Sequence, residues 1–145
     1  MIILGIASFL GLYWTLRNWN LFSGLVTLGL IGGIILVFLK LNNTIGLIVF
    51  LISAIIALLY ALSYGKFNFE KRLVLTFIIL PVMLYWFFFL SHFPGAEWLW
   101  FGLFLPFAAL LFGITRAVNL KYEWGFVIIL LFEAFTHIYP KFLFS

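Results

Sequence analysis

Long apolar runs alternate with short polar stretches along the whole chain. A helix that crosses a lipid bilayer needs about 20 mostly apolar residues, within a range of roughly 17–25. The runs stay apolar throughout and lack the in–out alternation of a β-barrel strand. The pattern therefore predicts an all-α fold, a polytopic transmembrane bundle of six helices joined by short loops. The expected spans cover residues 2–16, 21–39, 44–63, 73–90, 98–115 and 124–139 of a single transmembrane domain.

Polar and basic residues are confined to the predicted loops. Every Asn lies between spans, as expected when unpaired polar groups in hydrocarbon cost several kcal/mol each. Six of the eight Lys and Arg residues follow the first, third and fifth spans: Arg17, Lys66, Lys71, Arg72, Arg116 and Lys121. Because basic loops stay in the cytoplasm, we expect a protein of the cell membrane with both termini on the non-cytoplasmic side.

The composition excludes a water-soluble globule. Hydrophobic residues make up 67% of the 145 residues and charged residues only 8%, with a mean hydropathy of +1.30; soluble domains carry about 25% charged residues. The absence of Cys excludes disulfides, thiolate metal sites and thiol catalysis. The net charge of +4 follows from the loop pattern and indicates no nucleic-acid partner. The expected partner is the lipid bilayer.

Small residues in the second and third spans predict close helix packing. Gly29 and Gly33 form a small-xxx-small pair, and Ala57 and Ala61 offer a second narrow face. We expect these two spans at the centre of the bundle. An alternative is a homodimer that forms through the Gly29 face.

A short motif recurs in the two halves of the chain. Residues Leu12 to Trp14 have the same sequence as Leu84 to Trp86, near the ends of the first and fourth spans. Six spans can arise from two copies of three, and an odd number of spans per copy inverts the second copy. The chain is therefore compatible with a 3+3 inverted repeat.

One carboxylate lies inside a predicted span. Glu133 follows Trp124 by nine residues, which is about 14 Å along a helix and near mid-depth. An acid at this depth costs roughly 2.5–3.5 kcal/mol on insertion scales and usually faces the bundle interior or a wet cavity. His137 follows at i+4 on the same face, where the two side chains can meet. Thr136 and Ser53 could extend this polar centre.

These residues predict a small protein that moves or senses a small solute or a proton. One alternative is an accessory or structural subunit of a larger membrane complex, in which Glu133 pairs with a partner. Another is a membrane-embedded lipid-modifying enzyme with an outer-side site formed by His92, Glu97, Glu133 and His137, although no phosphate loop, GxSxG or paired-acid motif occurs. His92, Glu97, Glu133 and His137 are candidate ligands for a metal such as Zn²⁺, and the two histidines could hold a haem. The sequence assigns no cofactor.

Overall fold

Six α-helices and one 3₁₀ helix form the part of the chain that the computed structural model describes, which is residues 2–39, 43–65, 67–94 and 96–143. No strand occurs in these ranges, so the all-α prediction is confirmed. The elements are α1 (Ile2–Arg17), α2 (Leu21–Phe38), α3 (Asn43–Ser63), α4 (Phe69–Leu90), η1 (Ala96–Phe104), α5 (Leu105–Thr115) and α6 (Trp124–Leu143).

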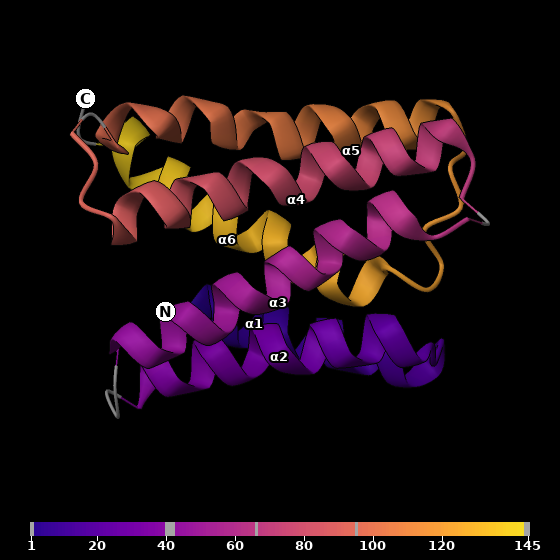
Figure 1. Cartoon of the computed structure of the whole chain (residues 1–145), viewed down its shortest axis with the longest axis horizontal. Helices are drawn as coiled ribbons and strands as arrows, with labels where there is room; N and C mark the ends of the chain where they lie inside the picture. Colours follow the sequence, from indigo (N-terminus) through magenta and orange to yellow (C-terminus); the bar gives the residue numbers. More distant parts are fainter. Residues whose placement is uncertain (1, 40–42, 66, 95, 144–145) are drawn as a thin grey trace.

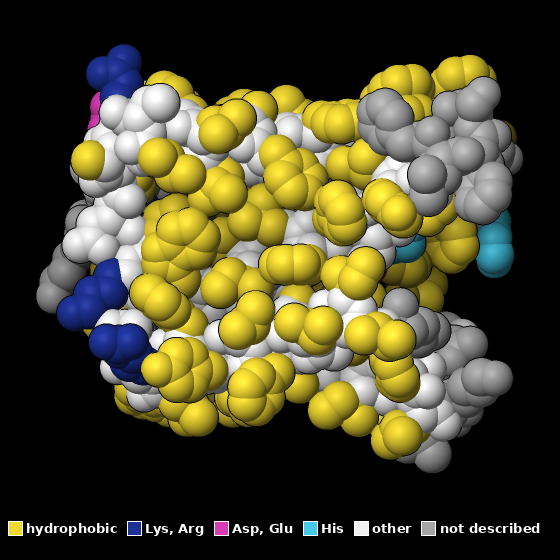
Figure 2. Space-filling model, turned by 180° about the vertical axis from the view of Figure 1, so that it is seen from behind, with side chains coloured by type: hydrophobic (Ala, Val, Ile, Leu, Met, Phe, Trp, Pro, Cys, Tyr) yellow, Lys and Arg dark blue, Asp and Glu magenta, His cyan; other side chains and the backbone are white. Residues whose placement is uncertain are grey.

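The helices are dimensioned for a bilayer. Among the described residues, four segments are long and apolar enough to cross a membrane, and α1 and α6 are shorter apolar helices. Apolar side chains cover most of the face of the molecule seen in Figure 2, between its two ends. Large apolar residues remain exposed on several helices, for example Phe9, Leu25 and Leu111. Such a surface suits lipid tails as its solvent.

The helices are arranged around α6. In Figure 1, α1, α2 and α3 lie on one side of the bundle and α4 and α5 on the other, with α6 running between them. α6 packs against α1, α2, α4, α5 and η1, whereas α3 packs against α2 and α4. The expectation that the second and third helices are central is therefore wrong, because the last helix occupies the middle of the bundle.

Charge divides the two ends of the bundle. The described basic side chains all lie at the end formed by the loops after α1, α3 and α5, which we call the basic end: Arg17, Lys71, Arg72, Arg116 and Lys121. The first turn of α1 and the last turn of α6 lie at the opposite end, called the terminal end (Figure 1). Figure 2 shows the same division, with Lys and Arg at one end and a His side chain at the other.

Asparagine caps set two helix starts. The Asn20 side chain accepts hydrogen bonds from the first-turn amides of α2, and the Asn68 side chain accepts one from the Lys71 amide at 3.0 Å. Such a cap satisfies backbone donors that have no partner within the helix. α4 therefore begins at Phe69, one turn before the predicted start at residue 73.

The fifth span is not a single α-helix. The 3₁₀ helix η1 runs into α5, and the two form one continuous rod in Figure 1. Pro106 lies in the first turn of α5, where its missing N–H breaks no helical hydrogen bond. The apolar run over residues 98–115 predicts one helix with Pro106 near its middle, whereas Pro106 marks the change from 3₁₀ to α geometry.

Small residues bring α2 and α3 into close contact. A Cβ on Gly33 would lie 2.8 Å from the Gly46 carbonyl oxygen, and a Cβ on Gly29 would overlap the Ser53 hydroxyl. Ala57 of α3 is fully buried. Gly29 and Gly33 therefore lie at the contact of α2 with α3, and α3 covers this face of α2 within the chain.

The inverted repeat stays a prediction. In such a repeat α5 corresponds to α2 and α6 to α3. α2 packs Gly29 and Gly33 against α3, but α5 packs its Gly113 against Val74 of α4. Corresponding helices therefore use their small residues towards different neighbours.

Candidate functional site

α6 carries the candidate site and approaches α1 closely at one point. A Cβ on Gly11 would lie 2.5 Å from the Gly125 carbonyl oxygen, and a Cβ on Gly125 would overlap the Thr15 hydroxyl. The Thr15 and Thr27 hydroxyl oxygens lie 3.0 Å apart and share a hydrogen bond. Glycine at both positions lets the helix backbones meet, which fixes α6 against α1 and α2.

Glu133 lies inside the bundle, as its depth in the sequence predicts. Glu133 is only 4% exposed to solvent. The indole N–H of Trp86 on α4 donates a hydrogen bond to Glu133 Oε1 at 3.0 Å. His137 Nε2 lies 3.0 Å from the same oxygen. The carboxylate therefore has two hydrogen-bond partners, one from its own helix and one from α4.

Tyr85 orients the imidazole of His137. The phenol oxygen lies 3.4 Å from Nδ1, and the two ring centroids are 4.8 Å apart. If Tyr85 donates to Nδ1, the proton of the neutral imidazole is on Nε2 and points to Glu133. If His137 is charged, both nitrogens donate and the phenol accepts. The same geometry thus accommodates the loss or gain of one proton.

A cavity of about 270 Å³ opens beside this group. Its polar wall comes from α4 and α6, and its apolar wall comes from α1, α2 and α3. The lining residues are Leu4, Gly33, Ile34, Val37, Phe38, Leu47, Phe50, Trp86, Glu133, Thr136 and His137. The cavity lies towards the terminal end, since it is lined by the beginning of α1 and α3 and the last turns of α2, α4 and α6.

The two hydroxyls proposed to extend the polar centre have different positions. Thr136 lines the cavity, but its hydroxyl donates to the backbone oxygen of Glu133 at 2.8 Å rather than to the carboxylate. Ser53 donates to the Val49 carbonyl at 2.8 Å and packs against Gly29. Ser53 therefore belongs to the α2–α3 contact and is not brought to the polar centre.

The structure brings together two of the four candidate metal ligands, Glu133 and His137. His92 is exposed after the end of α4, with a positive φ of 50°, a left-handed conformation that His adopts more readily than most residues. The Glu97 side chain lies outside the described part of the structure. Among the described residues, no group of three or more His, Cys, Asp or Glu side chains could hold a metal.

The haem alternative gains no geometric support either. Both nitrogens of His137 face protein groups, Nε2 towards Glu133 and Nδ1 towards Tyr85. An axial ligand needs one imidazole nitrogen for the iron. Binding of haem would therefore require His137 to give up one of these partners.

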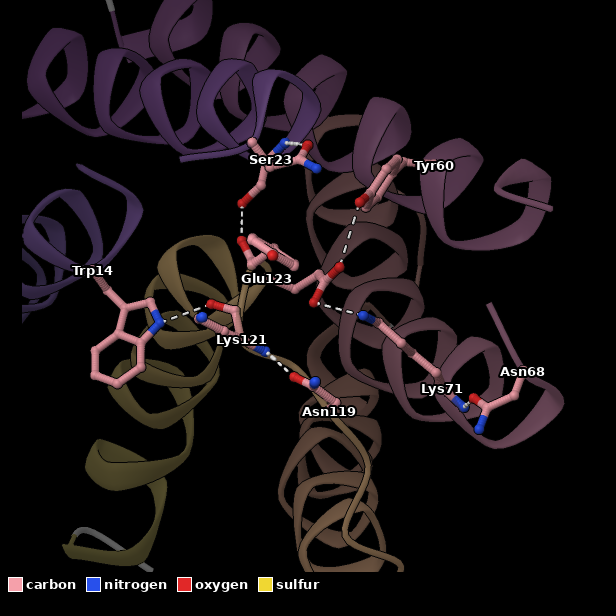
Figure 3. Close-up of polar contacts among 10 residues, drawn as sticks. Trp14, Ser23, Tyr60, Asn68, Lys71, Asn119, Lys121 and Glu123 are labelled. Atoms are coloured by element: carbon pink, nitrogen blue, oxygen red, sulfur yellow. Dashed lines mark hydrogen bonds and ion pairs between the residues drawn. The ribbon is translucent and has the colours of Figure 1, made fainter. Parts of the chain in front are cut away.

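A second buried acid, Glu123, lies at the basic end. Its place beside Lys121 in the sequence predicts an ordinary boundary charge, which is wrong because the residue is only 1% exposed. Its Oε2 lies 2.9 Å from Lys71 Nζ, and the Tyr60 hydroxyl donates to Oε1 at 3.4 Å (Figure 3). The Lys71 ammonium also lies 4.3 Å from the centre of the Phe67 ring. This cluster joins α3, α4 and the start of α6.

The loop before α6 holds Glu123 in place. The Trp14 indole N–H donates to the Lys121 carbonyl at 3.0 Å, and the Ser23 hydroxyl donates to the Tyr122 carbonyl (Figure 3). α1 and α2 thus fix the two residues that precede Glu123. A cleft of about 430 Å³ lies beside the cluster, lined by Asn20, Tyr60, Tyr64, Phe67, Asn68, Lys71, Asn119, Tyr122 and Glu123.

A layer of buried apolar side chains separates the two polar groups. The residues of α6 between Glu123 and Glu133 include Phe126, Val127 and Ile129, which are fully buried. α4 contributes fully buried apolar side chains to the same core, among them Leu75 and Ile78. The bundle therefore has a polar site towards each end and a closed apolar centre.

Comparison with protein-family models, with curated proteins and with solved structures gave no match to this chain.

Proposed function

We propose that this protein binds a small solute in the cavity beside Glu133 and moves it across the membrane with exchange of a proton. One observation carries the proposal. Glu133 is a nearly buried acid that lines a cavity and hydrogen-bonds to an imidazole. Acids in such positions are expensive to keep and commonly mark solute or proton pathways.

The contact between Glu133 and His137 supports proton exchange. A carboxylate and an imidazole 3.0 Å apart can share or release one proton with little movement. The Tyr85 hydroxyl can act as donor or acceptor towards the imidazole in either state. A solute that changes the charge next to Glu133 would therefore change the protonation of the pair.

The apolar layer favours a carrier over an open pore. Fully buried apolar side chains such as Phe126 and Ile129 lie on α6 between the cavity and the basic end. A solute bound beside Glu133 would need helices to rearrange before leaving on the other side, as in transporters that alternate access around a fixed site.

The charge division supports an orientation in the cell membrane. Basic loops stay on the cytoplasmic side, so we propose that the basic end faces the cytoplasm. Both termini and the mouth of the cavity then face the opposite side.

Two alternatives have less support. An accessory subunit that offers Glu133 to another protein needs that acid on an outer face, whereas Trp86 and His137 already bind it. A lipid-modifying enzyme that uses His92 needs this residue beside the acid, whereas His92 is an exposed residue after α4.

Proteoliposomes filled with a pH-sensitive dye test the proposal. Amines, amino acids, carboxylates and alkali cations are added outside in turn, and the internal pH is followed. We expect at least one class to give a pH change that protein-free liposomes lack. Glu133→Gln should abolish it, whereas Glu70→Gln, which removes an acid at the basic end, should preserve it. Absence of any protein-dependent change, or full activity in Glu133→Gln, would refute the proposal.

A further inference from the structure

The cavity beside Glu133 has walls of opposite chemistry. Ile34, Val37 and Phe50 line the side formed by α2 and α3, and Glu133 lies on the side formed by α6. Among the described side chains that line the cavity, Glu133 is the one carboxylate and His137 is the one basic group. A ligand that fits both walls has an apolar body and one polar head.

The hydrogen bonds of Glu133 indicate the charge of that head. The donors from Trp86 and His137 both reach Oε1, and no described residue donates to Oε2. His137 is itself engaged by Tyr85 on its other nitrogen. A ligand head that donates hydrogen bonds therefore has an acceptor available on the cavity wall. A head that only accepts hydrogen bonds finds the Trp86 and His137 donors already engaged.

Charge makes an ammonium the best such donor. With His137 neutral, the ionised Glu133 carries a negative charge in a site of low dielectric constant, where an ammonium gains more than an uncharged hydroxyl. The face of an aromatic ring such as Trp86 also attracts cations. A carboxylate head would meet the like charge of Glu133 and be repelled.

The volume limits the apolar body. Cavities that hold drug-sized ligands span roughly 300–1,000 Å³, and this one is about 270 Å³. One aromatic ring or a short alkyl chain fits this space, whereas a steroid or a lipid does not.

We infer that the cavity is a binding site for small lipophilic primary amines, with the ammonium on Glu133 and the apolar body against Ile34, Val37 and Phe50. This inference deepens the proposed function and rests on it, because it names the class of solute.

Three molecules that share one body and differ in the head test this site: 2-phenylethylamine, 2-phenylethanol and phenylacetate. Their binding to the purified full chain in detergent is measured by calorimetry at neutral pH, with empty micelles as reference. We expect the amine to bind at least 10-fold more tightly than the other two. Glu133→Gln should lower the affinity for the amine to that for the alcohol. Glu133→Asp should restore part of the difference in affinity.

Glu70→Gln serves as the matched control and should bind the amine as the unaltered chain does. Far-UV circular dichroism and elution volume establish that each variant is folded. Equal binding of amine and alcohol, tighter binding of phenylacetate, or full amine binding in a folded Glu133→Gln variant would overturn the inference.

The binding and flux experiments separate the two proposals. Amine binding without any protein-dependent pH change in liposomes would keep the binding site and refute transport. A pH change driven by another solute, without amine binding, would keep transport and refute the amine site.

Discussion

The crossing of α1 and α6 gives a sharp test of the packing. In Gly125→Ala the new methyl group would occupy the place of the Thr15 hydroxyl and lie 2.9 Å from the Gly11 carbonyl oxygen. Rotation of the Thr15 side chain could relieve the first overlap, but it would break the hydrogen bond to Thr27. The backbone oxygen of Gly11 cannot rotate away. Overpacking of this kind costs about 1–3 kcal/mol, and a hydroxyl hydrogen bond between membrane helices averages about 0.6 kcal/mol.

The matched control is Gly32→Ala, because a Cβ at Gly32 has no neighbour within 4 Å. Alanine in a helix interior is favoured over glycine by roughly 0.5–1 kcal/mol, so this variant should be equally or more stable. We therefore expect the unfolding free energies of Gly125→Ala and Gly32→Ala to differ by about 2 kcal/mol. Unfolding in mixed micelles of increasing SDS fraction, followed by far-UV circular dichroism, measures this difference.

A second substitution identifies the cause. Thr15→Ala removes the side-chain oxygen that the Gly125 methyl group would meet, while the Gly11 carbonyl stays. The double variant should recover part of the loss, so that the two effects are not additive. If Gly125→Ala is as stable as Gly32→Ala, or if the double variant is exactly additive, the close approach of α1 and α6 described above does not exist.

Three further predictions concern the buried ion pair, the acid in the cavity and the topology. Lys71→Met should lower the free energy of unfolding in SDS by about 3–5 kcal/mol, because it leaves Glu123 buried without its cation. Adding Glu123→Gln should recover most of this loss. An equally large loss in the double variant would contradict the ion pair. Trp86→Phe removes the indole donor to the Glu133 carboxylate. It should lower the free energy of unfolding by about 1.5–3 kcal/mol, the value of a hydrogen bond to a charged group. An unchanged unfolding curve would mean that the hydrogen bond is not made. The chain has no Cys, so Ser91→Cys and Asn119→Cys should each react with an impermeant maleimide from one side only, and from opposite sides; reaction of both from the same side would refute the helix count.

The helices and the acid in the cavity follow from local signals. Runs of apolar residues bounded by Asn and basic residues predict the six helices because hydrocarbon tolerates no other backbone structure of this length. Glu133 and His137 could be predicted to meet because i and i+4 positions share a helix face. Because the two residues are one helical turn apart, their contact can be predicted without knowing the rest of the fold.

The partners from other helices could not be predicted in the same way. Tyr85 and Trp86 stood out in the sequence only as a repeated motif, and nothing local indicates that α4 turns them towards α6. Glu123 lies near Lys121 in the sequence and has the pattern of a surface charge, but Lys71 of a distant helix covers it. Such contacts depend on which helices become neighbours, and short loops fix only consecutive pairs.

The central position of α6 has a consequence for the order of assembly. Chains enter the membrane in the order in which they are synthesised, and N-terminal elements form first. α1 and α2 can pair early because Thr15 and Thr27 satisfy each other. α6 emerges only after the helices that surround it, and it must slide its acid between them to reach Trp86. The cavity therefore cannot be complete before α6 has inserted, and a folding defect in α6 should leave the earlier helices in the membrane without the acid that lines the cavity.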